Sequence, residues 1–120
     1  MKKYSLLLLE DDVSLGEILL ARLQKEYRKV TWAQTLASAR ENLSKEEYDL
    51  LILDVGLPDG SGFDLAKEQE GQNPIIFLTA LNSAEDRLQG YELGADEYIP
   101  KPFHLKELMI RIDRTLMKSS

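Results

Sequence analysis

Four short polar segments carry the residue types that could do chemistry. The acidic run Glu10-Asp11-Asp12, the single residues Asp54 and Thr79, and Lys101 each stand at the end of a short apolar segment. Carboxylates held together favour a cation, and oxygen ligands are those that Mg²⁺ prefers. A carboxylate can attack phosphorus, while a lysine and a hydroxyl can donate hydrogen bonds to phosphoryl oxygens. Together these residues suit phosphoryl transfer onto an aspartate.

Each of these residues also has a simpler interpretation. Acidic residues after a strand often cap the next helix, and Asp54 could begin a turn. Thr79 could be a core threonine, and Lys101 a solvated charge. All four simple interpretations would have to hold together, at the ends of four different strands. The pattern therefore favours a single shared site.

Five apolar segments alternate with helical patterns and must position these groups. The predicted strands are Ser5–Leu9, Lys29–Ala33, Leu50–Leu53, Ile75–Leu78 and Glu97–Ile99. Near-continuous apolar runs are typical of parallel strands buried on both faces. Five strand-helix repeats predict one α/β domain, a parallel sheet with helices on both faces. Ligands bind beyond the carboxyl ends of such strands, so the polar segments should meet there.

The predicted helices have recognisable ends. They cover 15–23, 36–43, 63–69, 83–93 and 105–116. Asp12 or Ser14 could cap the first and Thr35 the second, and Ser83 with Asp86 forms a capping box for the fourth. Gly94 is placed to end the fourth helix.

Composition bounds the class of protein. A chain of 120 residues with 43% hydrophobic and 30% charged residues fits one domain over 1–120. The lack of cysteine excludes disulfides and thiolate sites, and His104 alone cannot build a histidine-based zinc site. A net charge of −6 argues against direct contact with nucleic acid. No apolar run suits a membrane span or a secretory signal, so we expect a cytoplasmic protein. Lys118-Ser119-Ser120 looks like the start of a linker.

Four motifs together resemble the receiver domains of response regulators, the CheY-like family. They are Leu8–Asp12, Leu53–Gly62, Phe77–Ala80 and Gly94–Phe103, and the resemblance spans essentially the whole chain. It implies a flavodoxin-like sheet of strand order 2-1-3-4-5. It also implies two-component signalling by a domain that is no enzyme for external metabolites but catalyses its own Mg²⁺-dependent phosphorylation and dephosphorylation.

The resemblance assigns roles to individual residues. Asp54 would accept the phosphoryl group from a sensor histidine kinase. Mg²⁺ would be held by Asp11, by Glu10 through water, by Asp54 and by the main-chain carbonyl of Gly56. Lys101 would contact the phosphoryl group and pair with a carboxylate in its absence. The bond from Lys101 to Pro102 would be cis, and Asp12 would cap the first helix.

The resemblance also implies a switch and an output. On phosphorylation, the hydroxyl of Thr79 would turn toward the phosphoryl group, and Tyr98 would move from outside to inside. These movements would alter the face formed by the fourth helix, fifth strand and fifth helix. Without the family, Tyr98 would be a half-buried strand tyrosine.

The second half of the chain is most similar to the OmpR-like subfamily, whose members carry a C-terminal winged-helix DNA-binding domain that is absent here. In that subfamily phosphorylated receivers pair through this face; the alternative is a charged, solvated surface. The candidate dimer residues are Arg87, Leu88, Asp96, Glu97, Glu107, Ile110, Arg111 and Arg114.

Some features depart from the family pattern. The stretch 63–73 is short, which predicts a clipped third helix. Gly56 and Leu81 provide no polar side chain to guide water toward the phosphoryl group. We therefore expect a fairly long-lived phosphoryl group.

Three alternatives remain at this stage. A phosphatase of the haloacid dehalogenase type would need an Asp-x-Asp motif at the first strand, whereas Asp54 lies on the third and is followed by Val55-Gly56. A degenerate receiver acting as a scaffold is disfavoured because Asp11, Asp54, Thr79 and Lys101 are all present. A flavin binder of the same fold would need a hydroxyl-rich phosphate loop after the first strand.

Overall fold

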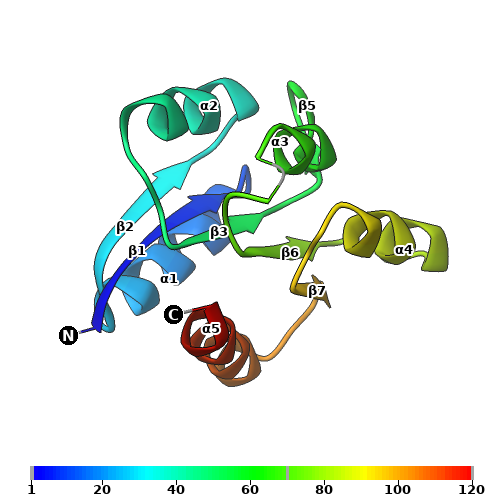
Figure 1. The fold of residues 1–120 in the computed structure, drawn as a ribbon. Helices are drawn as coiled ribbons and strands as arrows, with labels where there is room; N and C mark the ends of the chain where they lie inside the picture. Colours follow the sequence, from blue (N-terminus) through cyan, green and yellow to red (C-terminus); the bar gives the residue numbers. More distant parts are fainter. Residues whose placement is uncertain (1, 70, 120) are drawn as a thin grey trace.

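The main sheet has five parallel strands in the order β2-β1-β3-β6-β7 (Figure 1). The structure is a computed structural model that describes residues 2–69 and 71–119. The strands are β1 (Lys2–Leu9), β2 (Tyr27–Ala33), β3 (Leu50–Leu53), β6 (Ile75–Thr79) and β7 (Glu97–Pro100). Counting only these strands, the order is the predicted 2-1-3-4-5, so the fold prediction is confirmed.

Five helices cover the two faces of the sheet. They are α1 (Val13–Gln24), α2 (Leu36–Lys45), α3 (Gly62–Glu68), α4 (Ala84–Glu92) and α5 (Leu105–Ser119). Helices α1 and α5 lie on one side, and α2 and α3 on the other (Figure 1). Helix α4 lies on the side of α2 and α3, because Gly90 approaches the rings of Phe77 and Tyr98, which belong to that core.

The strands are buried on both faces, which explains their continuous apolar sequence. Along β1, Leu7 and Leu9 join the core beneath α2 and α3, whereas Leu6 and Leu8 join the core beneath α1 and α5. All four are at most 1% exposed. Successive side chains of a strand point to opposite faces, so a two-sided sheet requires apolar residues at every position.

The helix caps follow the sequence prediction. Asp12, rather than Ser14, caps α1 by accepting a hydrogen bond from the Leu15 amide at 3.1 Å. Thr35 caps α2. The capping box of α4 is present, with both Ser83 and Asp86 bonded to main-chain amides.

Several element boundaries differ from the prediction. Strands β1 and β2 begin at Lys2 and Tyr27, earlier than predicted, because Lys2 still pairs with Tyr27 beyond a register shift between Lys2 and Ser5. Helix α5 includes Lys118 and Ser119, so the prediction of a linker there was wrong, and Ser120 lies outside the described residues. The polar end of α5 gives no periodic signal, although its main chain stays helical. Helix α3 has only 7 residues, as the short 63–73 stretch suggested.

A two-stranded antiparallel hairpin was not predicted. It pairs β4 (Gly56–Leu57) with β5 (Gly60–Ser61), directly after Asp54. Strands this short carry no alternation of apolar and polar residues. Among the described residues, no helix has the length and apolarity needed to cross a membrane.

Candidate functional site

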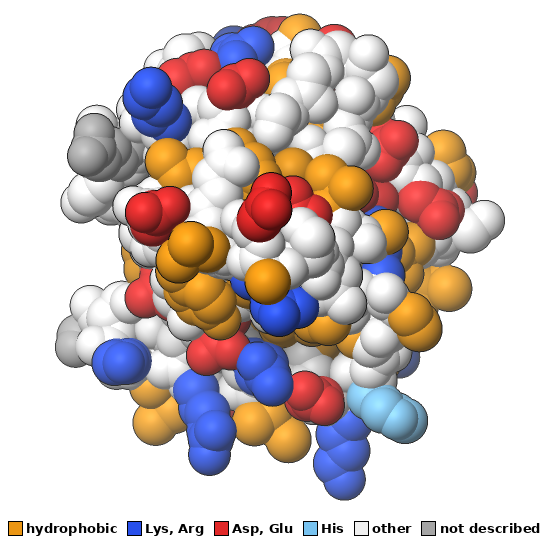
Figure 2. Space-filling view, turned by 90° about the vertical axis from the view of Figure 1, so that its right-hand side faces the viewer, with side chains coloured by type: hydrophobic (Ala, Val, Ile, Leu, Met, Phe, Trp, Pro, Cys, Tyr) orange, Lys and Arg blue, Asp and Glu red, His pale blue; other side chains and the backbone are white. Residues whose placement is uncertain are grey.

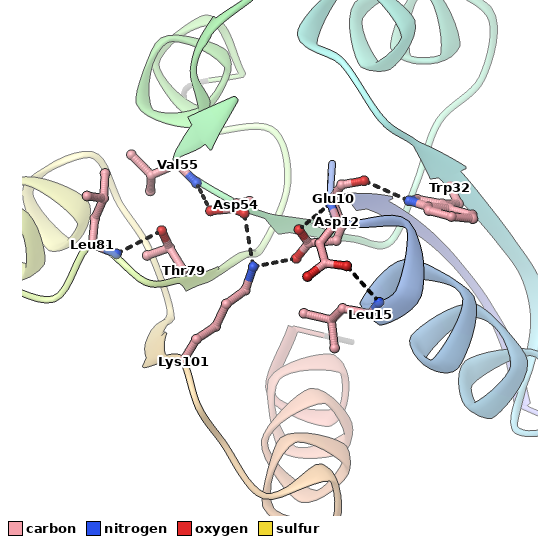
Figure 3. A network of polar contacts seen from close by, with 9 residues as sticks. All are labelled: Glu10, Asp12, Leu15, Trp32, Asp54, Val55, Thr79, Leu81 and Lys101. Carbon is pink, nitrogen blue, oxygen red and sulfur yellow. Dashed lines mark hydrogen bonds and ion pairs between the residues drawn. The ribbon is translucent and has the colours of Figure 1, made fainter. Parts of the chain in front are cut away.

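The carboxyl ends of the central strands meet at one edge of the sheet. Strands β3 and β6 point toward the right-hand side of Figure 1, and Figure 2 shows that side face-on. Acidic side chains lie across the middle of this face, with hydrophobic side chains beside them (Figure 2). The polar segments from separate parts of the sequence are brought together here, as Figure 3 shows for Glu10, Asp54, Thr79 and Lys101.

Asp54 lies directly after β3 and is only 6% exposed. One of its carboxylate oxygens, Oδ1, accepts a hydrogen bond from the Val55 amide at 2.7 Å. The other, Oδ2, accepts one from the Lys101 ammonium at 3.0 Å. The Asp54 amide donates to the Leu9 carbonyl at 3.0 Å, which ties the residue to β1. Asp54 is therefore held at a fixed position with its carboxylate beside a cation.

Lys101 joins two buried carboxylates. Its ammonium donates to Glu10 Oε1 at 2.7 Å as well as to Asp54, and Glu10 is 1% exposed. Burial raises the pKa of Glu10, although its hydrogen bonds to Lys101 and to the Asp12 amide oppose that effect. Burial alone would lower the pKa of Lys101, but the hydrogen bonds to the two carboxylates outweigh it and raise the pKa. Lys101 is therefore charged at neutral pH. The Lys101–Pro102 peptide bond is cis.

The oxygen atoms at this edge fit a divalent cation. Glu10, Asp11 and Asp54 each offer a carboxylate oxygen, and these atoms all lie within 4.8 Å of one another. Asp11 is exposed, so it can reach a cation that arrives from solvent. Three carboxylates facing one ammonium leave an excess of negative charge, and Mg²⁺ prefers oxygen ligands. Gly56, the other predicted ligand, lies exposed in β4, two residues after Asp54.

The β4–β5 hairpin is fastened to the rest of the domain by a residue that sequence reasoning missed. Asp59 accepts hydrogen bonds from the Leu36 amide at 2.9 Å and the Ala37 amide at 3.1 Å, at the start of α2. These amide bonds hold the pKa of Asp59 below its usual value. An Asp-Gly pair predicts a turn, but nothing in the sequence connects it to a helix 22 residues away.

Thr79 and Tyr98 are connected through the main chain of Leu81. The Thr79 hydroxyl oxygen accepts a hydrogen bond from the Leu81 amide at 3.2 Å. The Tyr98 hydroxyl donates to the Leu81 carbonyl at 2.6 Å. Thr79 is 1% exposed, and its own carbonyl accepts from the Lys101 amide at 2.9 Å. The two predicted switch residues therefore bind opposite sides of one residue in the loop after β6.

Tyr98 has an inward position in this structure. It is 4% exposed, with its ring 5.7 Å from that of Phe77 and 6.4 Å from that of Tyr91. Burial, chiefly, raises the pKa of its phenol to about 12. The resemblance placed Tyr98 outside before phosphorylation and inside afterwards, so the structure has the position expected for the phosphorylated form.

The predicted dimer residues lie on α4, on α5, and at or just before the edge strand β7. Within one chain, Arg111 pairs with Glu97 at 2.6 Å and with Glu107 at 2.9 Å. Leu88 is 61% exposed and Ile110 is 48% exposed. The remaining candidates have other neighbours or face solvent. Arg87 donates to Asn82, Asp96 accepts from the Ile75 amide, and Arg114 is exposed.

This five-stranded parallel α/β domain has the CheY-like receiver fold. The chain belongs to the response regulator receiver domain family, which matches residues 6–113. It is thus a two-component signalling domain.

Known proteins support this assignment at the level of sequence and structure. The chain is 41% identical over 110 residues to the response regulator protein PmrA of Pseudomonas aeruginosa, covering 89% of this chain and 50% of that protein. It is 43% identical over 121 residues to the transcriptional regulatory protein RprY of Bacteroides fragilis, covering 98% of this chain and 51% of that protein. These relatives are regulators of the OmpR-like subfamily, and the chain spans about half of their length.

A solved structure agrees closely. The non-phosphorylated HemR receiver domain from Leptospira biflexa superposes with a TM-score of 0.88 at 50% sequence identity. The superposition covers 95% of this chain and 94% of that one.

Proposed function

We propose that Asp54 accepts a phosphoryl group from a sensor histidine kinase in a reaction that depends on Mg²⁺. The observation that carries this proposal is the buried arrangement of Lys101 between the carboxylates of Asp54 and Glu10, at 3.0 and 2.7 Å. A nucleophilic carboxylate must approach an anionic phosphoryl group, and a lysine and a metal ion offset that repulsion. The receiver unit in this proposal is the whole chain, residues 1–120.

The site residues would act in distinct ways during transfer. An oxygen of Asp54 forms a bond to phosphorus as the bond from phosphorus to the donor's nitrogen breaks. Lys101 leaves its ion pair with Asp54 and donates to a phosphoryl oxygen, and the Thr79 hydroxyl donates to another. Glu10, Asp11, Asp54 and the Gly56 carbonyl would hold Mg²⁺, which supplies positive charge to the phosphoryl oxygens. This use of Asp54 distinguishes the domain from a phosphatase, since the phosphoryl group stays on the protein as a signal.

The link through Leu81 gives the phosphoryl group a way to act at a distance. If the Thr79 hydroxyl turns to the phosphoryl group, it gives up the Leu81 amide, and the loop is released to adjust. The same loop holds the Tyr98 hydroxyl through the Leu81 carbonyl. A change at Asp54 would thus act through this loop on Tyr98, which already lies inside in this structure, and on the surface of α4, β7 and α5.

The output we propose is pairing of two phosphorylated domains through that surface. Leu88 and Ile110 provide exposed apolar side chains, and Arg87, Asp96, Glu97, Glu107, Arg111 and Arg114 provide charges. Exposed ion pairs contribute little each, so they would set the register of the dimer rather than its affinity. Because the curated relatives are about twice as long, the pairing would control a C-terminal DNA-binding domain in the cytoplasm.

The test is the intact mass of the protein after incubation with Mg²⁺ and acetyl phosphate. We expect the wild type to gain one phosphoryl group, about 80 Da. The gain should disappear in Asp54→Asn and when Mg²⁺ is omitted. Size-exclusion chromatography of the same sample should show a shift toward a dimer for the wild type only.

Other outcomes would point to the alternatives. An Asp54→Asn protein that still gains the mass would place the acceptor elsewhere. Steady release of phosphate from a simple monoester would favour a phosphatase. A folded wild type that takes no phosphoryl group from either acetyl phosphate or a kinase would favour a binding scaffold.

The phosphoryl group on Asp54 should be long-lived. Gly56 has no side chain, and Leu81, which is 44% exposed, presents an apolar one, so neither orders an attacking water. We expect the adduct to persist for minutes or longer after the phosphodonor is removed in the presence of Mg²⁺, as measured by mass over time. Replacing Leu81 with a polar residue should shorten the lifetime. Decay of the wild-type adduct within seconds would contradict this expectation.

A further inference from the structure

Trp32, the only tryptophan in the sequence, lies behind the acidic loop rather than in the site. It belongs to β2, and its indole N–H donates to the main-chain carbonyl of Glu10 at 2.9 Å. Figure 3 shows the ring on the side of Glu10 away from Lys101. Glu10 is therefore held from both sides, by Lys101 at its carboxylate and by Trp32 at its main chain.

The hydrogen bond from Trp32 continues the pairing between β1 and β2 one residue beyond the end of their main-chain ladder. The last pair of the β1–β2 ladder is Leu9 with Ala33, and the Glu10 amide still donates to the Ala33 carbonyl at 3.0 Å. The next main-chain group, the Glu10 carbonyl, is bonded by the Trp32 side chain instead. Both main-chain polar groups of Glu10 are thus fixed to β2. The peptide that joins Glu10 to Asp11 consequently has a defined orientation.

Helix α1 leaves room for the indole ring. A Cβ atom at Gly16 would lie 2.0 Å from Trp32 Cζ2 and 2.3 Å from Cε2, so only a glycine allows this close approach. The Gly16 amide donates to the carbonyl of Asp12 at 2.8 Å, and Asp12 caps the same helix. The ring therefore packs against the first turn of α1, the helix that follows the acidic loop.

We propose that Trp32 is a positioning residue for the cation site. By fixing the main chain on both sides of the acidic loop, it makes the carboxylates of Glu10 and Asp11 converge with that of Asp54. Ligands held in place before the cation arrives lose less conformational freedom on binding. This inference rests on the proposed Mg²⁺-dependent function of the same site.

The test is the Mg²⁺ affinity of Trp32→Phe, measured by calorimetry. Phenylalanine keeps an aromatic ring but has no N–H to donate to Glu10. Losing one such hydrogen bond should weaken Mg²⁺ binding about threefold to tenfold. Val30→Ala is the matched control because Val30 lies two residues earlier on the same strand and packs against the same core. We expect the control to bind Mg²⁺ as the wild type does, while urea unfolding reports the stability of both variants.

A second readout needs no substitution. Trp32 is bonded to Glu10, so Mg²⁺ held by the Glu10 carboxylate would bring positive charge close to the indole. The emission of Trp32 in the wild type should therefore change with Mg²⁺ and saturate with the affinity found by calorimetry. Wild-type emission that stays unchanged at saturating Mg²⁺ would overturn the inference. Equal Mg²⁺ affinity of Trp32→Phe and the wild type, or equal weakening in Val30→Ala, would do so too. A wild type that binds no Mg²⁺ would instead refute the proposed function itself.

Discussion

Replacing Lys101 by methionine should destabilise the metal-free domain by about 3 kcal/mol. The side chains of Glu10 and Asp54 are 1% and 8% exposed, and Lys101 is the cation that both contact. Methionine fills a similar volume but leaves two buried carboxylates facing each other without a positive charge. Removing one partner of a buried ion pair is costly because the remaining charge stays desolvated. Urea unfolding at neutral pH without divalent cations would measure the loss.

Two further measurements make this prediction specific. Mg²⁺ should reduce the stability difference between Lys101→Met and the wild type, because it returns positive charge to the same carboxylates. A second substitution, Glu10→Gln, should recover part of the stability lost in Lys101→Met. The exposed Lys106 of α5 provides the control, and Lys106→Met should change stability by less than about 0.5 kcal/mol. If both methionine variants were equally stable, the ion pairs of Lys101 would not support the fold.

Gly62→Ala should cost about 3 kcal/mol of stability, at the high end for overpacking. A Cβ atom at Gly62 would lie 1.9 Å from the main-chain oxygen of Asp54 and 2.9 Å from its carbonyl carbon. These are main-chain atoms, so no side chain can rotate to relieve the contact. The segment is also held on both sides, by the bond from the Gly62 amide to Val55 and by that from the Asp54 amide to Leu9.

Gly56→Ala is the matched control for this substitution. Gly56 lies in the β4–β5 hairpin that precedes Gly62, but apart from its chain neighbours no heavy atom of residues 2–69 and 71–119 lies within 4 Å of a Cβ placed there. Its φ angle is not positive either. The midpoint of urea unfolding should therefore stay near that of the wild type. Similar losses in both variants would mean that neither glycine of this segment tolerates a side chain, rather than that Gly62 faces a specific clash.

The sequence was informative wherever burial or main-chain capping determines the residue type. Strands such as Leu50–Leu53 are apolar throughout because both faces are covered, and Asp12 and Ser83 cap helices through bonds to amides a few residues away. These are local patterns with a direct physical cause. The family motifs added the site, because its residues stand at strand ends that a parallel sheet brings together.

Contacts between distant segments were not predictable. Trp32 reaches the carbonyl of Glu10, 22 residues earlier, and a tryptophan in a strand usually indicates only a packed surface. The hydrogen bonds from the start of α2 to Asp59 are another contact between distant segments. The close approach of Gly16 to Trp32, which requires a glycine, is a third. Such contacts depend on the angles at which elements cross, which a single sequence does not encode in any periodic form.

The two bonds to Leu81 have a thermodynamic consequence for how this domain and its partners influence each other. Leu81 accepts from the Tyr98 hydroxyl and donates to the Thr79 hydroxyl, so both residues bias one equilibrium of the loop. Coupling of this kind is reciprocal: if phosphorylation strengthens pairing by some factor, pairing must favour the phosphorylated form by the same factor. Any condition that favours pairing of the domain would therefore also favour its phosphorylated form.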